Sequence, residues 1–384
     1  MSAVVELLQE LIRIPSVNPQ GDPGTPHVGE GEIARFVGDY LVKLGMSVEM
    51  QFVEKDRPTV IGRLKSKSSK RHILLGPHTD TVSVAGMTVE PFGGVVKDGR
   101  VLGRGASDTK GSMSAMLVAL KEIVDQKKCP PNTDIWFAGL MGEESGNDGI
   151  EYLMKSDYFK TKGILPNFGI AGEPTELRIV HRHKGALWLR LRTRGRACHA
   201  SRPDLGDNAI VKMRKAIDFI TTDMPKAYSH LEDSLLGKAT FNVTGIKGGS
   251  KVNIIPDLCE IEMDHRSLPQ ETHKEVIERL KKSLPECEVE IISDRPGLNT
   301  PADDPYIQKL TDVLSRHSPK ADRKSFLTGA PWFADCSLMS GGGVPAIAFG
   351  PGSISQAHTK DEFIEISELE KCVDVFRDFF VALD

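Results

Sequence analysis

The sequence predicts an α/β fold with a mixed, mostly parallel sheet, flanking helices and an inserted smaller α+β domain. Its 384 residues exceed the roughly 250–300 at which one hydrophobic core stops growing, so two domains are expected. Helical and strand-like segments alternate in the first part, whereas residues 179–294 follow the order β-α-β-β-α-β. The first pattern then returns. We therefore expect one domain from residues 1–178 and 295–384, interrupted by a split βαβ, ferredoxin-like insert at 179–294.

The first domain begins with two predicted helices. One is expected over residues 2–14, because apolar side chains recur at helical spacing until Pro15 stops the pattern. The residues of this apolar face are Val4, Leu7, Leu8, Leu11 and Ile12. A second helix is expected over residues 30–44.

Short apolar runs bounded by turn residues predict the strands of the sheet. They read SVEMQFV, TVIGRL and HILLGPH, and the last fits a strand that is buried on both faces. A helix over residues 110–126 then leads into a strand over residues 134–140. Strands that alternate with helices in this way are typical of a mostly parallel sheet.

The insert is expected to contain four strands and two helices. Its strands are ALWLRLRTRG, FNVTGI, LCEIEMDHR and EVEIIS, and its helices cover residues 208–222 and 270–284. A helix over residues 305–315, the strand AIAFGPG and a helix over residues 367–383 then complete the first domain.

Composition and charge exclude several classes of protein. Apolar residues make up 39% and charged residues 27%, which is ordinary for a globular protein, and the net charge is −4 with acids and bases interspersed. The basic run at residues 65–71 is interpreted as a solvated turn, so no nucleic-acid partner is expected. No apolar run approaches the ~18 residues of a membrane helix and the N-terminus has no signal-peptide pattern, so we expect a cytoplasmic protein that does not bind membranes.

The six cysteines are scattered without a CxxC pair, so free thiols are expected. Cys198 directly precedes His199, but neighbouring residues of a strand point to opposite faces. We therefore interpret Cys198 as a small buried apolar residue rather than a nucleophile.

Five clusters of acidic or imidazole residues follow apolar runs and stand beside glycine or proline. Their sequences are LLGPHTDTV, GRGASDTKGS, GLMGEESG, IAGEPTEL and GPGSISQAHTKDE. The residues that they contribute are His78, Asp80, Asp108, Glu143, Glu144, Glu173 and His358. Sites of α/β sheets form in the crevice beyond the carboxyl ends of the strands, so these side chains are candidates for one shared metal site.

Each cluster taken alone also has an ordinary structural explanation. His78 could be a loop histidine, and Asp108 could cap the helix that follows it. The acids after the later strands could be solvated turn residues, and His358 could belong to a surface loop. Five such clusters at strand ends together favour the metal site.

The ordered motifs resemble the zinc-dependent acetylornithine deacetylase and succinyl-diaminopimelate desuccinylase family, which also holds aminoacylases and glutamate-type carboxypeptidases. The motifs that carry the resemblance are HTDTV, GRGASDTKG, EES, GEP, CHASRPDLGDNAI and GPGSISQAH. They span nearly the whole chain in order. The resemblance implies an enzyme that hydrolyses the amide between an acyl group and an amino acid, and a homodimer in which the insert serves as lid and dimerisation domain.

The resemblance also implies two zinc ions, which suit nitrogen and oxygen ligands. By position, Asp108 bridges the ions, His78 and Glu173 complete one site, and Glu144 and His358 complete the other. The spacing does not distinguish zinc from cobalt or manganese.

Three further residues are expected to take part in catalysis. Glu143 is the candidate general base, since a carboxylate outside the metal shell can take a proton from water and pass it to the leaving amine. Asp80 is expected to accept the second ring N–H of His78 and so fix its tautomer. By the resemblance, His199 lies over the active site of the partner subunit, where it can stabilise the oxyanion.

The substrate-binding residues are assigned by the resemblance. Asn253 and Arg266 match positions around the substrate carboxylate, and a guanidinium suits bidentate binding of a carboxylate. Arg266 could instead form an ion pair with Asp264 or Glu262. Gly352 is expected to allow a close approach of the backbone next to the last metal ligand.

Two positions depart from the common pattern of the family. Thr109 follows Asp108 where methionine is common and where the peptide bond is often cis, and the lid motif reads HAS. Neither change removes a ligand. Several motifs resemble acetylornithine deacetylase more than the desuccinylase: GPGSISQAH, AHTKDEF, DHRSLP, and GEPTEL with its downstream HKG. This resemblance favours N2-acetyl-L-ornithine as substrate and hence a role in arginine biosynthesis. A desuccinylase, a dipeptidase or carboxypeptidase, an aminoacylase and a non-catalytic binding relative are the alternatives.

Overall fold

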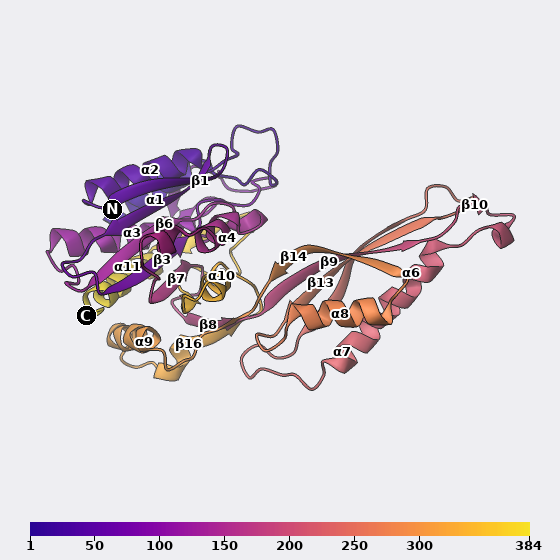
Figure 1. Ribbon diagram of the computed structural model, residues 1–384. Helices are drawn as coiled ribbons and strands as arrows, with labels where there is room; N and C mark the ends of the chain where they lie inside the picture. Colours follow the sequence, from indigo (N-terminus) through magenta and orange to yellow (C-terminus); the bar gives the residue numbers. More distant parts are fainter. The chain divides into compact units, whose positions relative to one another are not determined.

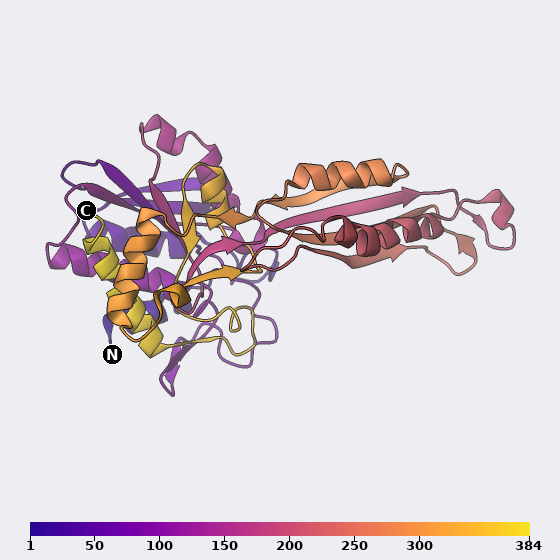
Figure 2. The same cartoon turned by 90° about the horizontal axis from the view of Figure 1, so that it is seen from below.

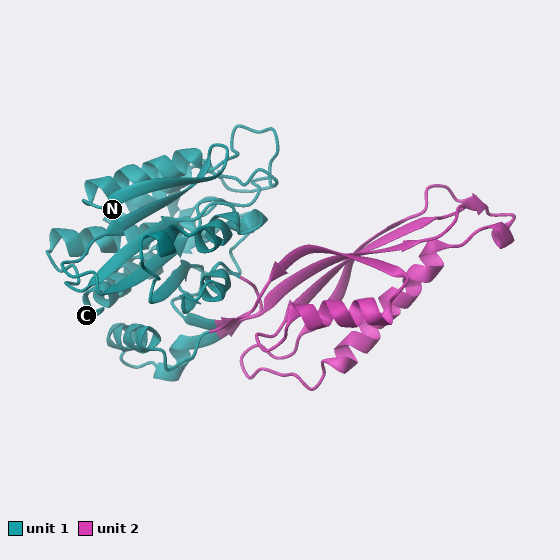
Figure 3. Ribbon diagram, viewed as in Figure 1, with its two compact units in different colours: residues 1–181, 300–328, 334–384 teal, residues 182–299, 329–333 magenta.

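The chain divides into two units in the computed structural model, which describes all 384 residues. The first unit consists of residues 1–181, 300–328 and 334–384 (Figure 3). The second consists of residues 182–299 and 329–333.

The first unit is built on a mixed sheet with a parallel centre (Figure 1). The central strands are parallel neighbours in the order β6-β3-β7-β17. Their bounds are β3 Arg71–Pro77, β6 Thr133–Gly139, β7 Phe168–Gly172 and β17 Ala346–Ala348. Nearly every residue of these strands is buried, as expected for parallel strands that are covered on both faces.

Antiparallel strands complete the sheet on both sides of its centre. On one side they are β1 Ser47–Glu54 and β2 Arg57–Leu64. On the other is the start of β8 Ile179–His183, and β16 Leu327–Ala330 pairs with β8. The last two residues of β8 belong to the second unit and pair there with β15 Leu298–Asn299. The fold class predicted from the sequence is therefore confirmed, with parallel pairing confined to the middle of the sheet.

Helices cover both faces of the parallel centre. One face carries the main apolar core, to which five helices contribute. They are α1 Ala3–Arg13, α2 Gly31–Lys43, α3 Lys110–Asp125, α9 Pro305–His317 and α11 Ile366–Val381. Phe159 and Met339 lie on the opposite face, because Phe159 contacts Trp136 and the methyl of Met339 fills the space beside Gly76. Their helices are α5 Tyr158–Thr161 and α10 Cys336–Gly341, with α4 Asp148–Lys155 next to α10.

The second unit has a four-stranded antiparallel sheet in the order β11-β13-β9-β14. The strands are β9 Gly185–Arg194, β11 Thr240–Gly248, β13 Leu258–Ser267 and β14 Cys287–Arg295. Helices α6 Ala209–Asp218 and α8 His273–Ser283 pack on one face around a second apolar core (Figures 1 and 2). The chain order β9-α6-β11-β13-α8-β14 confirms the predicted split βαβ pattern.

The other face of this sheet is a ladder of charges. Arg190 and Arg192 alternate along β9 with buried leucines, and they pair with Glu260 of β13 and Glu290 of β14. Period-two alternation of this kind is what a strand with one covered face requires.

Two smaller findings bear on the sequence-based expectations. All six cysteines are free, but Cys198 is half-buried rather than buried, because it stands in the two-residue strand β10 Cys198–His199 away from the apolar core. No helix combines the length and the apolar character that a bilayer crossing requires.

Candidate active site

The carboxyl ends of the four parallel strands deliver most of the predicted site. His78 directly follows β3, Glu173 directly follows β7, and Glu143 and Glu144 follow β6 in a short 3-10 turn. His358 lies in the segment that leaves β17. Because parallel strands end at one edge of the sheet, these side chains converge.

Asp108 reaches the same place from the start of α3. The helix begins at Lys110 and Thr109 occupies its N-cap position, so the Asp108 carboxylate does not cap the helix. The Asp108–Thr109 peptide bond is cis. The carboxylate lies between the two histidines, with Oδ1 3.0 Å from His78 Nε2 and Oδ2 3.4 Å from His358 Nε2.

Glu144 closes this arrangement. Its Oε2 lies 3.0 Å from His358 Nε2, and ligand atoms of His78, Asp108 and Glu144 all lie within 4.8 Å of one another. Glu173 is buried close enough for its charge to act on His78 and Glu143. The structure thus brings together all five residues that the sequence proposes as metal ligands.

The tautomer of His78 is fixed by the backbone rather than by a carboxylate. Its Nδ1 donates to the backbone carbonyl of Asp80 at 2.9 Å, while the Asp80 carboxylate is 3.6 Å away. Because Nδ1 donates to this carbonyl, Nε2, which lies 3.0 Å from Asp108 Oδ1, is the ring nitrogen that would bind a metal after losing its proton.

The carboxylate of Asp80, which lies 3.6 Å from His78 Nδ1, also has two backbone partners. Its two oxygens accept the backbone N–H groups of Glu143 at 2.9 Å and Glu144 at 3.0 Å. Burial raises the pKa of Asp80 to about 7, and these two N–H groups are its compensation for the loss of water. Asp80 therefore fixes the turn that presents both glutamates.

A buried acid that the sequence reasoning missed supports the segment before Asp108. Glu362 accepts the backbone N–H groups of Gly105, Ser107 and Asp108 at 2.9–3.1 Å and pairs with Arg104 at 2.7 Å. Its only signal in the sequence is an acid placed directly before the apolar strand β18 Phe363–Glu365. That strand joins β4 Val95–Lys97 and β5 Arg100–Leu102 in a small sheet.

Acids and imidazoles shape the electrostatics of the site. Burial raises the pKa of Glu143 well above its ordinary value, and the charge of Glu173 raises it further. The pKa of Glu173 is also raised well above its ordinary value, by burial and by the charge of Asp108. Hydrogen bonds to Asp108 and Glu144 raise the pKa of His358 to about 10. Acids gathered away from water in this way are stabilised by cations between them.

The donor set fits a metal centre. It consists of imidazole nitrogens and carboxylate oxygens without a thiolate, and it offers one carboxylate between two imidazoles. Nitrogen and oxygen ligands of this kind suit zinc and neighbouring divalent ions.

Two other predicted residues lie side by side in the second unit. His199 is exposed in β10, which pairs with β12 Ile254–Ile255, and its Nδ1 lies 2.7 Å from Ser201 Oγ. The backbone carbonyl of Asn253 accepts the N–H of Ala200 at 2.9 Å. His199 and Asn253 therefore occupy one small two-stranded element.

Arg266 stands at the opposite end of the second unit's sheet from that element. It is near the end of β13, and its guanidinium makes two hydrogen bonds with Asp264, at 2.9 and 3.0 Å. The structure thus shows the ion pair that was the alternative explanation of Arg266, and within this unit it does not bring Arg266 together with His199 and Asn253.

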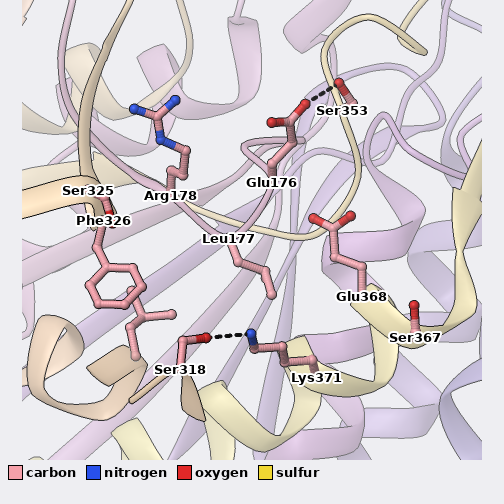
Figure 4. Close-up of a pocket in the computed structure, with 11 residues that line it drawn as sticks. Glu176, Leu177, Arg178, Ser318, Ser325, Phe326, Ser353, Ser367, Glu368 and Lys371 are labelled. Atoms are coloured by element: carbon pink, nitrogen blue, oxygen red, sulfur yellow. Dashed lines mark hydrogen bonds between the residues drawn. The ribbon is translucent and has the colours of Figure 1, made fainter. Parts of the chain in front are cut away.

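Gly352 lies where a close backbone approach is required. Its φ is +89°, and a Cβ there would lie 2.4 Å from Ser107 Oγ. A surface depression of about 700 Å³ is lined by Ser353, the residue after Gly352, and by no histidine (Figure 4). In its wall, Glu368 accepts the N–H of Gly352 at 3.2 Å, and Glu176 accepts the hydroxyl hydrogen of Ser353 at 2.6 Å. These two glutamates therefore hold the start of the loop that leads to His358.

Comparison with known proteins gives the family of the chain. The model of peptidase family M20/M25/M40 matches residues 74–382. The acetylornithine deacetylase of Proteus mirabilis is 30% identical over 380 residues, which cover 95% of this chain and 93% of the relative. The acetylornithine deacetylase of Photorhabdus laumondii is also 30% identical, over 94% of this chain and 92% of the relative.

Solved structures share the fold at lower identity. A crystal structure of an M20 family metallo-carboxypeptidase from Sulfolobus solfataricus has a TM-score of 0.82 at 20% identity, over 99% of both chains. A dinuclear metal-binding peptidase of the M20 family from Bacillus subtilis has a TM-score of 0.70 at 14% identity, over 99% of this chain and 97% of the other. A family match over most of the chain and a full-length relative at 30% identity lead to one conclusion: the chain belongs to peptidase family M20/M25/M40 and is a metal-dependent hydrolase of acylated amino acids or peptides.

Proposed function

We propose that the protein removes the acetyl group from N2-acetyl-L-ornithine, with water as co-substrate and ornithine and acetate as products. In this reaction the amide C–N bond breaks, the water oxygen joins the acyl carbon and the amine leaves with the proton. We place the reaction in the cytoplasm, in arginine biosynthesis. The alternatives are N-succinyl-diaminopimelate, other N-acyl amino acids and dipeptides.

One observation carries the proposal of metal-dependent amide hydrolysis. The Asp108 carboxylate directs one oxygen toward His78 and the other toward His358, which is the arrangement that a carboxylate shared by two metal ions needs. The choice of acetylornithine is supported by the full-length identity to two acetylornithine deacetylases.

We infer that the metals are two zinc ions. Asp108 would bridge them, His78 and Glu173 would hold one, and Glu144 and His358 would hold the other. Bound there, the ions would lower the pKa of water and polarise the carbonyl group of the substrate.

Glu143 would move the proton. Its backbone is held by Asp80, and it belongs to the same turn as the ligand Glu144, so its carboxylate can take a proton from water at the metal centre and give it to the leaving nitrogen. The same turn leaves the Glu143 carboxylate outside the compact group of ligand atoms, where it remains available to accept a proton.

We also infer a homodimer formed through the second unit. Strand β11 is an edge strand that carries the exposed Ile246, at 58%. On α6, Ile210 lies beside Gly248 of this strand and is 42% exposed, and the next residue, Val211, is 57% exposed. An unpaired strand next to exposed apolar residues favours pairing with a second copy of the chain. We call Ile210, Val211 and Ile246 the apolar edge. The dimer would let His199 reach the site of the partner subunit and donate to the oxyanion.

The test is an amine-release assay of the purified, zinc-loaded protein. The substrates are N2-acetyl-L-ornithine, N-succinyl-diaminopimelate, other N-acyl amino acids and dipeptides, each with and without a chelator. Chelator-sensitive release that is fastest from acetylornithine is the expected result. Faster release from another substrate would overturn the acetylornithine assignment, and chelator-resistant release would overturn the metal mechanism.

A further inference from the structure

Asn147 lies between the half-buried carboxylate of Glu143 and the buried carboxylate of Asp335. Its side-chain nitrogen is 3.2 Å from Glu143 Oε1 and 2.9 Å from Asp335 Oδ1. Asn147 is 6% exposed and Asp335 is 2% exposed, so water does not compete strongly for these contacts. The carboxamide can use one N–H for each carboxylate.

The backbone around Asn147 fixes the distance between its amide and Glu143. The segment from Gly142 to Asn147 is a tight turn, because the Gly142 carbonyl accepts the N–H groups of Gly146 at 3.1 Å and Asn147 at 2.7 Å. Asn147 adopts a left-handed conformation with φ of 61°. Asparagine adopts this conformation more readily than most residues, so it suits both the turn and the side-chain contact.

Asp335 anchors this turn to a distant part of the chain. It stands directly before α10 and is separated from Asn147 by 188 positions in sequence. The Asp335 carboxylate accepts one N–H of the amide and thereby orients the group, so that its other N–H faces Glu143.

A neutral donor suits the carboxylate of a general base. A lysine or arginine at this place would orient Glu143 but would also stabilise its charge strongly and weaken it as a proton acceptor. An amide holds one oxygen by a neutral hydrogen bond, so the other oxygen keeps its affinity for a proton. Asp80 already fixes the backbone of Glu143, and Asn147 adds a fixed point on the side chain.

We infer that Asn147 is a positioning residue that holds the carboxylate of Glu143 in its reactive orientation, and that Asp335 orients the Asn147 amide. The inference rests on the proposed role of Glu143 as general base. It assigns Asn147 and Asp335 no contact with substrate or metal.

The test compares turnover, binding and stability in three variants. Asn147→Gly keeps the left-handed backbone and removes the amide, and Asn147→Asp replaces it by a repelling carboxylate. For the substrate that the wild type cleaves, kcat is expected to fall about 10–100-fold in both, while KM changes less than about threefold and metal content stays at the wild-type value.

The double variant Asn147→Asp with Asp335→Asn separates positioning from folding. An amide at position 335 can donate to a carboxylate at position 147, so the bond between them and the melting temperature are expected to recover. The carboxylate now faces Glu143, so kcat is expected to stay low. Recovery of kcat together with stability would show that the pair has only a structural role and would overturn the inference.

A crystallographic comparison gives a readout without turnover. In metal-loaded wild-type crystals, Glu143 is expected in one rotamer with Oε1 at hydrogen-bond distance from Asn147, and in Asn147→Gly crystals in more than one. An unchanged single rotamer in the variant would overturn the inference. If the wild type cleaves no substrate of the panel, the proposed function fails, and this comparison alone decides on the positioning role.

Discussion

At the scale of single residues, the adjacent Glu143 and Glu144 have different partners, which fits the different roles proposed for them. Both are presented by the turn that Asp80 fixes, but only Glu144 lies against His358 and within the compact group of ligand atoms. Glu143 instead contacts Asn147. Neighbouring residues of one turn therefore point to different partners, which is what separate metal-binding and proton-transfer roles require.

This division predicts different results for matched substitutions. Glu143→Gln is expected to keep the metal content and to lower kcat about 10²–10⁴-fold, because the amide cannot accept the proton of water. Glu144→Gln, the control in the adjacent position, is expected to lose metal. Elemental analysis and steady-state kinetics measure both. Metal loss in Glu143→Gln that matches its loss of turnover would show that Glu143 is a ligand and not the base.

A second residue-scale prediction concerns Gly352. In Gly352→Ala the left-handed backbone costs about 1–2 kcal/mol, and the new methyl group meets Ser107, whose Cβ is 3.3 Å away even if the hydroxyl rotates. Ser107 directly precedes Asp108, so lower metal affinity is expected in addition to lower stability. Gly343→Ala is the control, because its φ is also +89° but its nearest neighbour is a flexible leucine carbon at 3.5 Å. Urea unfolding and metal titration measure the difference, and equal behaviour of the two variants would contradict it.

Part of the candidate site follows from the sequence, because His78 and Glu173 directly follow apolar runs that become the parallel strands β3 and β7. The supporting contacts do not follow from it. Glu362 joins a segment more than 250 positions earlier, and Asp335 reaches Asn147 across 188 positions. Hydrogen bonds of this kind leave no periodic pattern in the sequence.

At the scale of elements, Asp134 ties the loop between β2 and β3 to β6. Its carboxylate accepts hydrogen bonds from Arg63 at 2.8 Å, from the Ser66 backbone and hydroxyl at 2.7 Å, and from Ser69 at 3.0 Å. Burial alone would raise the pKa of Asp134, but these donors outweigh it and hold the pKa below its ordinary value. A basic run that looks like a simple solvated turn is thus fixed by one buried acid.

The lowered pKa of Asp134 predicts how stability changes with pH. On acidification, Asp134 takes up its proton first in the unfolded chain, near the ordinary aspartate pKa of about 4, and only at lower pH in the folded chain. The stabilisation by the ionised carboxylate is therefore complete above about pH 4 and is lost as the pH falls through the lower pKa of the folded state. At pH 7, Asp134→Asn is expected to lower the free energy of unfolding by about 1–3 kcal/mol, since an amide nitrogen would face Arg63.

Urea unfolding of Asp134→Asn and the wild type at pH 7 and at decreasing pH measures this effect. The difference in the free energy of unfolding between the two proteins is expected to shrink below about pH 4. Asp157→Asn is the control, because Asp157 is an exposed acid whose pair with Lys160 contributes little. A difference between wild type and Asp134→Asn that does not change with pH would exclude the ionised carboxylate as its source.

Helices and strands were predictable from the sequence where a long apolar pattern repeats along them. The helix expected at residues 2–14 is α1, and the helix expected at 110–126 is α3, because long apolar patterns define them. The small sheet of β4, β5 and β18 was not expected, since its three-residue strands are too short for a pattern. The helix expected at residues 208–222 ends as α6 at Asp218 and continues as a π-helical turn to Asp223, a change of hydrogen bonding that a periodic pattern does not reveal.

At the scale of the whole molecule, the two units differ in what they leave exposed. The first unit buries its parallel strands on both faces and has the acids and imidazoles at their ends. The second covers one face of its sheet with helices, fills the other with ion pairs, and still leaves the apolar edge open. The proposed catalytic role of the first unit and the proposed assembly role of the second would account for this difference.

The last prediction tests that assembly role. The wild type is expected to elute in gel filtration at about twice the chain mass of 42.1 kDa. Val211→Asp places a charge in the apolar edge and is expected to shift the protein to the monomer mass with unchanged metal content. Ile292→Asp is the matched control, because Ile292 is 43% exposed on the opposite edge strand β14, and it is expected to remain a dimer.

Activity then shows whether the dimer completes the active site. If His199 acts on the site of the partner subunit, monomeric Val211→Asp is expected to lose turnover to the same extent as dimeric His199→Ala, about 10²–10³-fold for the loss of one oxyanion donor. Loss of turnover in the monomer despite its full metal content would place the missing group on the partner. A monomeric variant with full turnover, or a wild type that is itself monomeric and active, would show that each chain carries a complete site and that His199 has no role across the interface.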